Sequence, residues 1–216
     1  MTQESYIFDN KTIIDITPLI SPKTAVFPGD TAFSRSELLS FEKGHNLVLS
    51  SINSTVHIGA HTDAPSHYHS EGKTMESVSL EAYLGQCQVI EVAIEAGQRI
   101  LSKDLLQPVA SKRILLKTNS FPDPNNWNAD FNSCSKELIE FLDSKGVCLV
   151  GIDTPSVDLS DDKELEAHNS IYKNKMAILE GIVLSNVDPG LYQLIALPLP
   201  IEKADASPVR AILIKE

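Results

Sequence analysis

The chain has 216 residues, of which 42% are hydrophobic and 22% are charged, so it is long and apolar enough to bury a core. Its 29 acidic and 18 basic residues give a formal net charge of −11, and the lack of a basic run argues against a nucleic-acid partner. The most apolar stretch, residues 191–201, is too short for a membrane span and is broken by Pro198 and Pro200, so no membrane partner is expected.

Strand-like runs rich in Val and Ile are interspersed with three helical patterns. In chain order, we expect strands over residues 12–16 and 46–52, a short helix within 74–85, and strands over 88–92 and 113–118. A helix over 135–146, a strand over 147–153, a helix over 161–174, and strands over 192–199 and 209–215 follow. Several of these strands are apolar throughout, which is typical of strands that are covered on both faces.

The helical patterns carry local start and stop signals. Ser135 is a plausible N-cap and Gly146 a stop for one of them. Acidic residues begin the segment 161–174, and Gly85 ends the segment 74–85. Because strands outnumber helices, we predict an α/β fold, a single domain over residues 1–216, with a mixed sheet or two packed sheets and a helical layer.

Four of the six histidines lie in one segment, HIGAHTDAPSHYH at residues 57–69, with Asp63 among them. A helix would place the first two on one face, where they could hold a zinc, but Gly59 and Pro65 disfavour a helix. In an extended chain, all of these odd-numbered positions share one face. A straight strand, however, would separate the first two histidines by about 13 Å.

A strand or loop that curls at Gly59 would direct His57, His61 and Asp63 at one cation. Two imidazoles and a carboxylate with an open position describe a catalytic metal better than a structural one. Such an ion lowers the pKa of a bound water to about 7. His67, with an ordinary pKa of about 6.5, suits proton transfer to a leaving group. The spacing alone leaves the metal and the reaction open.

The remaining reactive side chains suggest no chemistry of their own. We interpret His45 and His69 as surface or hydrogen-bonded residues. Cys87, Cys134 and Cys148 form no CxxC pair, which argues against a secreted disulfide framework and predicts reduced, buried thiols. The first eleven residues lack a positive segment followed by an apolar one, so no secretory signal is expected. We therefore expect a cytoplasmic protein.

HIGAHTDAPSHY resembles the His-x-Gly-x-His-x-Asp-x-Pro-x-His signature of the metal-dependent cyclase/kynurenine formamidase family. Residues 15–33, with a Pro-Gly-Asp turn, are similar to the N-terminal block of that family, and residues 151–158 and 179–213 resemble its C-terminal blocks. The resemblance covers nearly the whole chain and is closest to the bacterial kynurenine formamidases.

The resemblance implies a pair of metal ions. His57, His61 and Asp63 would bind a first zinc, Asp63 would bridge to a second, His168 would bind that second ion, and Glu180 would bridge both. Two zinc ions per subunit are therefore expected, with manganese as the alternative. Glu180 lies in an apolar run, where a buried carboxylate needs a partner such as a metal, although an edge-strand Glu facing water would also fit. The assignment of His168 rests wholly on the resemblance.

The resemblance also implies the roles of His67 and Phe27. His67 would be the catalytic proton donor and acceptor, and Phe27 would pack on the substrate where the bacterial formamidases usually carry Trp. Ala60 replaces a frequent Thr beside the ligands. The implied fold is a swivelling β/β/α domain that forms a homodimer or a higher homo-oligomer.

The first functional hypothesis is hydrolysis of a small aromatic amide, N-formyl-L-kynurenine, to kynurenine and formate, a step of tryptophan degradation. Phe27 leaves open a second hypothesis, a cyclic amide of the isatin type opened by the same metal chemistry. A third hypothesis, from another class, is a non-catalytic metal-binding or ligand-binding protein.

Overall fold

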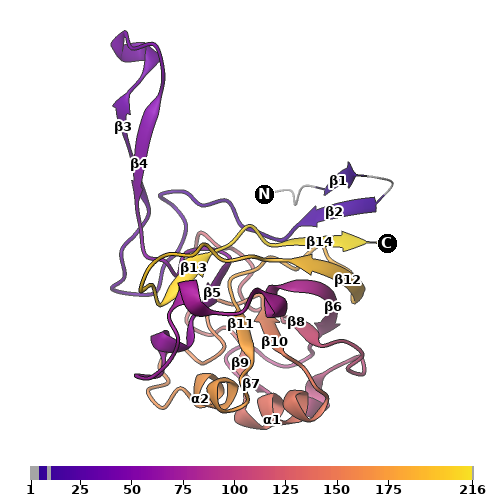
Figure 1. The fold of residues 1–216 in the computed structure, drawn as a ribbon. Helices are drawn as coiled ribbons and strands as arrows, with labels where there is room; N and C mark the ends of the chain where they lie inside the picture. Colours follow the sequence, from indigo (N-terminus) through magenta and orange to yellow (C-terminus); the bar gives the residue numbers. More distant parts are fainter. Residues whose placement is uncertain (1–4, 9–10, 216) are drawn as a thin grey trace.

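An eight-stranded mixed sheet dominates the computed structural model, which describes residues 5–8 and 11–215. Its strand order is β1-β2-β14-β12-β6-β8-β10-β11, antiparallel from β1 to β6 and parallel from β6 to β11. These strands are β1 Ser5–Phe8, β2 Lys11–Asp15, β6 Leu84–Glu91, β8 Arg113–Lys117, β10 Leu149–Ile152, β11 Ala177–Leu179, β12 Gly190–Ile195 and β14 Ile212–Lys215. The sheet thus joins strands from both ends of the chain (Figure 1).

Three two-stranded sheets and the helices complete the described elements. The small sheets pair β5 His61–Asp63 with β13 Ala206–Pro208, β3 Ser34–Leu39 with β4 Leu49–Asn53, and β7 Arg99–Ile100 with β9 Ser133–Cys134. The helices are α1 Lys136–Ser144 and α2 Glu166–Lys173, with short 3-10 turns η1 Phe41–Lys43, η2 Pro65–His67, η3 Met75–Ser77, η4 Leu80–Tyr83 and η5 Ser102–Asp104. In the described part of the chain, neither α-helix has the length and apolar character that a membrane crossing needs.

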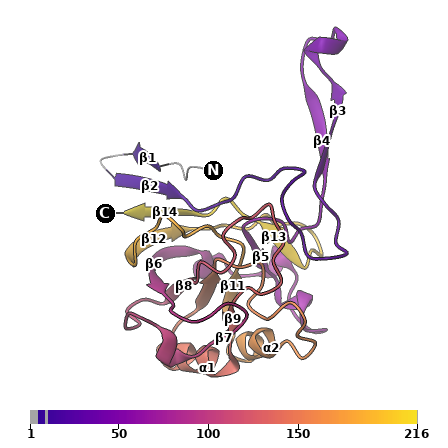
Figure 2. The ribbon, with the colours of Figure 1, turned by 180° about the vertical axis from the view of Figure 1, so that it is seen from behind.

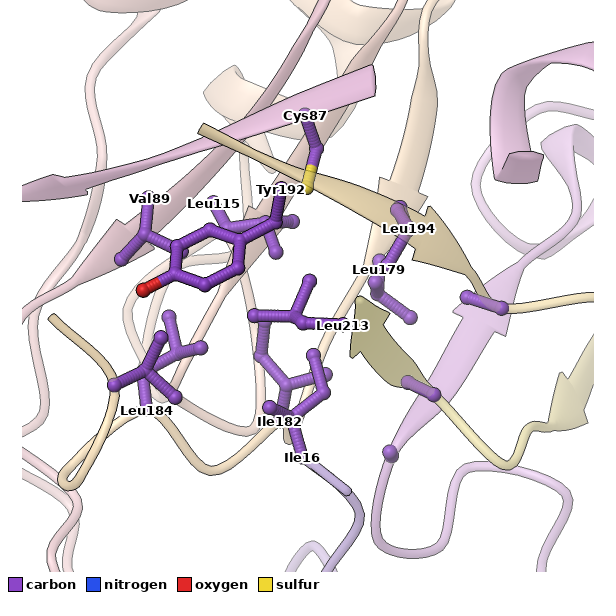
Figure 3. Packing of buried hydrophobic residues seen from close by; sticks show 14 of the residues in the cluster. Ile16, Cys87, Val89, Leu115, Leu179, Ile182, Leu184, Tyr192, Leu194 and Leu213 are labelled. Atoms are coloured by element: carbon purple, nitrogen blue, oxygen red, sulfur yellow. The ribbon is translucent and has the colours of Figure 1, made fainter. Parts of the chain in front are cut away.

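The central strands separate two hydrophobic cores because successive side chains point to opposite faces. Leu115 of β8 belongs to one core, and Leu116 belongs to the other, where α1 and α2 pack. Figure 3 shows Tyr192 of β12 among Val89, Leu115 and Leu184 in the first core. Burial on both faces explains why these strands are apolar throughout, and it confirms the predicted α/β class with a mixed sheet and a helical layer.

The structure confirms most of the predicted elements. Ser135 caps α1 by accepting a hydrogen bond from the Leu138 backbone amide at 3.0 Å. The second predicted helix, 161–174, begins late, at Glu166, because residues 161–165 form turns before it. The short helix predicted within 74–85 is not an α-helix.

Residues 74–85 instead form two 3-10 turns, η3 and η4, followed by the start of β6. Val78 separates the two turns in an extended conformation, with φ −74° and ψ 150°. The predicted strand over 46–52 begins only at Leu49 in β4. Strand β5 is part of the curled strand or loop that the sequence predicts over the histidine segment, whereas β13, which pairs with it, was missed.

Candidate metal centre

Strand β5 carries two candidate ligands and lies between two distant parts of the chain. On one side it pairs with β13, where Ala206 faces Asp63. On the other side, His61 forms an antiparallel bridge with Glu180, with backbone N···O distances of 3.0 and 2.9 Å. Gly59 has φ +60°, which provides the curl that the sequence predicts before His61. Three separate segments of the chain therefore meet at β5.

The six polar residues predicted for the site lie together. Asp63 is at the centre: its Oδ1 is 2.9 Å from His57 Nδ1, and its Oδ2 is 3.4 Å from His168 Nε2. His61 Nε2 is 3.1 Å from Glu180 Oε2. His61, Asp63, His168 and Glu180 are buried, His57 is half-buried, and the imidazole of His67 is 37% exposed.

Within residues 5–8 and 11–215, two sets of three His or carboxylate side chains have ligand atoms within 4.8 Å of one another, and both sets contain Asp63. One set consists of His57, Asp63 and His67, and the other of His61, Asp63 and Glu180. Asp63 is the residue that the two sets share, and its expected bridging role stays a prediction. The grouping differs from the predicted one, because His67 is close enough to Asp63 to be a ligand. His168 stands beside Asp63 and Glu180 without joining either set.

The orientation of the buried atoms fits a metal ion. Six buried side-chain atoms of residues 5–8 and 11–215 have no hydrogen-bond partner; four are serine hydroxyl oxygens, and the other two are His61 Nε2 and Asp63 Oδ1. Asp63 Oδ1 lies 2.9 Å from His57 Nδ1, and His61 Nε2 lies 3.1 Å from Glu180 Oε2. These atoms are close to one another, but their angles do not suit hydrogen bonds. A buried polar atom without a partner is costly. A cation placed among these atoms would satisfy both of them, because histidine nitrogens and carboxylate oxygens are ligands for zinc.

Each candidate imidazole ligand is held through its other nitrogen. His61 Nδ1 is 2.9 Å from the Gly59 carbonyl oxygen, and His168 Nδ1 is 2.8 Å from Asp158 Oδ2. His57 Nε2 is 3.0 Å from Asp205 Oδ2. Donation of the outer N–H to these oxygens fixes the ring and leaves the inner nitrogen available for a metal.

The carboxylates hold the imidazoles protonated when no cation is bound. Burial by itself would lower the pKa of His57, but the nearby Asp63 and Asp205 outweigh it and raise the pKa to about 9. Burial is likewise outweighed at His168, where Asp158 and Asp63 raise the pKa to about 10. The pKa of Asp63 is held well below its ordinary value, against its burial, by His168 and His57. A metal binding here would displace protons from these nitrogens.

His67 lies at the edge of the cluster, on η2. Its Nδ1 is 3.3 Å from Asp205 Oδ2, and its ring centroid is 4.3 Å from that of His57. The same carboxylate oxygen therefore contacts both His57 and His67. With Nδ1 directed at Asp205, Nε2 of His67 is the nitrogen left to exchange a proton.

A pocket of about 510 Å³ opens onto the cluster and has an aromatic wall. Phe27 lines it, half exposed, and its ring lies edge-to-face with Trp127 at a centroid distance of 5.2 Å. Trp127 is the only tryptophan of the chain, and Phe121 packs on it at 6.0 Å. The wall suits a flat apolar ring, and its size is that of a small-ligand site.

The other histidines and the cysteines do not line this pocket. His69 stacks on Tyr172, with ring centroids 3.9 Å apart, and His45 Nδ1 is 3.2 Å from the Ser40 carbonyl oxygen. The cysteines are free, with Cys87 and Cys134 buried, as predicted, but Cys148 is only partly buried.

Sequence reasoning missed Asp158, Asp205 and Trp127. Asp158 accepts hydrogen bonds from the backbone amides of Ala167 and His168 and pairs with Arg99 at 2.8 Å. Its one local signal was its place at the end of the segment GIDTPSVD. Asp205 lies within residues 179–213, which resemble a C-terminal block of the family, but nothing in that segment singles it out. Trp127 lies in a segment with no pattern that indicates a site.

Comparisons with known proteins identify the family of the chain and the fold that it shares with solved structures. The sequence model of the Cyclase family ("Putative cyclase") matches residues 14–159. A solved structure named as a potential metal-dependent hydrolase with cyclase activity superposes with a TM-score of 0.82 at 23% identity, covering 95% of this chain and 98% of that one. A predicted metal-dependent hydrolase from Bacillus stearothermophilus gives 0.80 at 24% identity, with 95% and 99% covered. Isatin hydrolase A from Labrenzia aggregata, bound to benzyl benzoate, gives 0.80 at 21% identity, with 94% and 93% covered.

Proposed function

Because the chain belongs to the cyclase family, we propose that it is a metal-dependent hydrolase that cleaves the amide bond of a small aromatic substrate. The observation that carries this proposal is the buried convergence at Asp63. Two unpartnered ligand atoms, His61 Nε2 and Asp63 Oδ1, lie beside a partly exposed His67 at the base of an aromatic-walled pocket. This combination places a binding site for a cation, a candidate proton carrier and a surface for an aromatic ring next to one another.

His57, His61, Asp63, His168 and Glu180 would hold the metal, which we propose to be zinc, two ions per subunit, with manganese as the alternative. A divalent ion held by these residues would supply Lewis-acid chemistry, which polarises a carbonyl group and makes water more acidic. The donor set, imidazole with carboxylate, is compatible with either metal.

His67 would carry the proton of the reaction. Hydrolysis adds water across the amide C–N bond, so the carbonyl carbon gains a hydroxyl group and the leaving nitrogen gains a proton. Asp205 would accept the Nδ1–H of His67, which orients Nε2 to take a proton from water and give it to the leaving nitrogen. Phe27 and Trp127 would pack on the aromatic ring of the substrate.

N-formyl-L-kynurenine is the substrate that we propose first. Its aromatic ring would pack against Phe27 and Trp127, and its formamide would reach the candidate metal ligands and His67, which line the same pocket. An aniline is the leaving group, and it needs the proton that His67 can supply. The reaction would then be a step of tryptophan degradation.

A cyclic amide of the isatin type is the second candidate. The likeness to isatin hydrolase A over nearly the full length of both chains favours it. Isatin also offers an aromatic ring fused to the amide, so the same wall and the same proton carrier would serve. Ring opening differs in one respect: the protonated nitrogen stays attached to the product.

The test is a parallel assay of N-formylkynurenine and isatin with zinc-loaded and manganese-loaded protein, with metal content measured on the same samples. We expect turnover of one substrate, its loss on chelation, and its recovery when the metal is returned. Metal binding without hydrolysis of any formanilide or cyclic amide would contradict the proposal and favour a non-catalytic binding protein.

His67→Ala separates the two roles open to His67. As proton carrier, its removal lowers kcat by about 100-fold or more and leaves the metal content unchanged. As a ligand, its removal lowers the metal content. His69→Ala is the matched control, since His69 lies two residues away and stacks on Tyr172 outside the pocket. Full activity of His67→Ala would remove both roles.

A further inference from the structure

Strands β8, β10 and β11 are parallel neighbours, so their carboxyl ends meet at one edge of the sheet, and β11 lies beside β5 (Figures 1 and 2). Asp153 comes directly after β10 at this edge. It lines the pocket but is only 7% exposed, and the proposed reaction gives it no role. Because a buried carboxylate needs partners, its contacts indicate what it does.

Three donors from the end of β8 surround the Asp153 carboxylate. Its Oδ1 accepts hydrogen bonds from the Thr118 hydroxyl group at 2.6 Å and from the Thr118 amide at 3.0 Å. Its Oδ2 accepts from the same amide at 3.0 Å and from the Asn119 amide at 2.9 Å. These contacts use about as many positions as a carboxylate has for hydrogen bonds, so Asp153 is directed at this turn and not at a substrate.

The turn that Asp153 holds has an unfavourable backbone. Asn119 has φ +55°, in the left-handed region that a non-glycine residue enters at a cost. The carboxylate binds the amide of Asn119 and the amide before it, so it holds both peptide units that lead into this conformation. Without the carboxylate, the backbone has less reason to keep it.

Residues 118–132, all of which the structure describes, form no helix or strand, so side-chain contacts determine the shape of this loop. Both ends of the loop meet at Ser120. Its Oγ is 2.8 Å from the Thr118 hydroxyl oxygen and accepts a hydrogen bond from the Asn132 amide at 2.8 Å. Its carbonyl oxygen accepts a hydrogen bond from the Asn128 side-chain amide, also at 2.8 Å. Asp153 therefore fixes the turn from which the loop starts and to which it returns.

The loop carries two of the three rings of the aromatic wall. Phe121 follows the turn directly, and Trp127 packs on it at a centroid distance of 6.0 Å. Phe27, the third ring, belongs to another segment and contacts Trp127 at 5.2 Å. Beside it, the Ala25 amide donates to the Pro124 carbonyl oxygen at 2.9 Å. A displacement of the turn would therefore move most of the surface that faces an aromatic ring.

The residues that follow Asp153 contact the candidate metal ligands. The Val157 amide donates to Glu180 Oε1 at 2.7 Å. Asp158 Oδ2 is 2.8 Å from His168 Nδ1. Six consecutive residues thus hold the aromatic wall at one end and two candidate ligands at the other.

We propose that Asp153 is a positioning residue that sets the aromatic wall at the distance from the metal ligands that the substrate ring requires. The inference rests on the proposed hydrolase function for the substrate, and on the contacts above for the wall. Asp153 acts through the turn and not on the reacting atoms, so its loss should weaken binding of the aromatic ring more than it slows the chemical step. At the other end of the segment, loss of Asp158 should weaken metal binding and leave the wall in place.

The test compares Asp153→Ala, Asp153→Asn and Thr118→Val with the wild type, each as the full chain loaded with zinc. Three quantities are measured: KM and kcat for the amide that the wild type hydrolyses, metal affinity by competition with a chelator, and acrylamide quenching of Trp127 fluorescence. Trp127 is the only tryptophan and is half-buried, so quenching reports the exposure of the wall without substrate or turnover.

Asp153→Ala should raise KM about 10-fold and leave kcat and metal affinity within about twofold, because each aromatic contact is equivalent to a factor of about 2–10. Quenching of Trp127 should increase. Asp153→Asn loses the charge but keeps an oxygen that both backbone amides can use, so it should retain most of the wild-type KM. Thr118→Val removes only the hydroxyl contacts and should raise KM about 3-fold.

Asp104→Ala is the matched control. Asp104 also accepts a hydrogen bond from a backbone amide, that of Leu101 at 2.8 Å, but it does not line the pocket. The control should change neither KM nor the quenching of Trp127. Asp158→Ala should lower metal affinity and leave the quenching unchanged.

The outcomes separate this inference from the proposed function. A wild type that hydrolyses neither amide contradicts the proposed function, and binding of formanilide, followed by Trp127 fluorescence, then replaces KM. The positioning role is overturned if Asp153→Ala keeps the wild-type ring affinity and quenching, or if Thr118→Val does so where Asp153→Ala does not fold. It is also overturned if Asp153→Asn loses as much affinity as Asp153→Ala with unchanged quenching, because charge and not position would then matter.

Discussion

Asp205 offers a test of how the site is held together. Its Oδ2 lies 3.0 Å from His57 Nε2 and 3.3 Å from His67 Nδ1, so one carboxylate orients a candidate ligand and the candidate proton carrier. Asp205→Ala removes both contacts, and Asp205→Asn keeps the shape but loses the charge. Either change lets the two rings place their protons on the wrong nitrogen.

The expected loss follows from the geometry. Removing an outer partner of a metal-binding histidine costs 10–100-fold in metal affinity or activity. The side chain of Asp205 is 50% exposed, and its contact with His67 is long, so water replaces part of its effect. We therefore expect losses of about 10-fold in kcat and about 10-fold in metal affinity, each equivalent to about 1.4 kcal/mol. The unfolding free energy should change by about 1 kcal/mol or less, as for exposed ion pairs.

The assay measures kcat and KM at saturating metal, and metal affinity by competition with a chelator. Asp205→Glu should restore part of both quantities, because it returns the carboxylate. Glu202→Gln, which removes an exposed acid from the same segment, should change neither. If Asp205→Ala folds and keeps the wild-type kcat and metal affinity, the reasoning about ring orientation is refuted.

Three further predictions concern backbone, protons and pocket. Gly181→Ala should destabilise the fold by about 3 kcal/mol or more in denaturant unfolding, because φ is +64° and a Cβ would lie 2.1 Å from the Gly59 carbonyl oxygen. The control Gly146→Ala, at φ +76° with open space around the Cβ, should lower the free energy of unfolding by only about 1 kcal/mol. Equal losses in the two variants would contradict the argument. The raised pKa of His57, about 9 against an unfolded value of 6.5, means that in metal-free protein the stabilisation from this proton is fully present below pH 6.5 and is lost as pH rises through about 9. Metal affinity should change in the opposite direction and rise with pH up to about pH 9, because the metal displaces this proton. Calorimetry of metal binding in two buffers of different ionisation enthalpy should therefore show proton release. Binding without proton release would contradict the assignment of His57 as a metal ligand. Trp127 should report ligand binding by a change in its fluorescence, since it lines the pocket and no second Trp exists; an aromatic amide that binds without any change would place binding elsewhere.

The sequence by itself determined the features that depend on near neighbours. Runs rich in Val and Ile predicted most strands of the large sheet, and Ser135 marked the start of α1. The spacing of His57, His61 and Asp63, with Gly59 to bend the chain, predicted a cluster of ligands because such positions share one face of an extended chain. The prediction failed at residues 74–85, where a helical pattern of side chains does not fix the backbone at Val78.

Tertiary structure alone decided what surrounds that cluster. Glu180 reaches His61 only because a backbone bridge joins them, and Asp205 reaches His57 because β13 pairs with β5. Trp127 stands beside Phe27 in the same way, from a distant loop. The spacing of residues along a segment fixes which side chains share a face, but not which distant segment pairs with it. That choice depends on burial and strand pairing over the whole chain, and here it completes the candidate site.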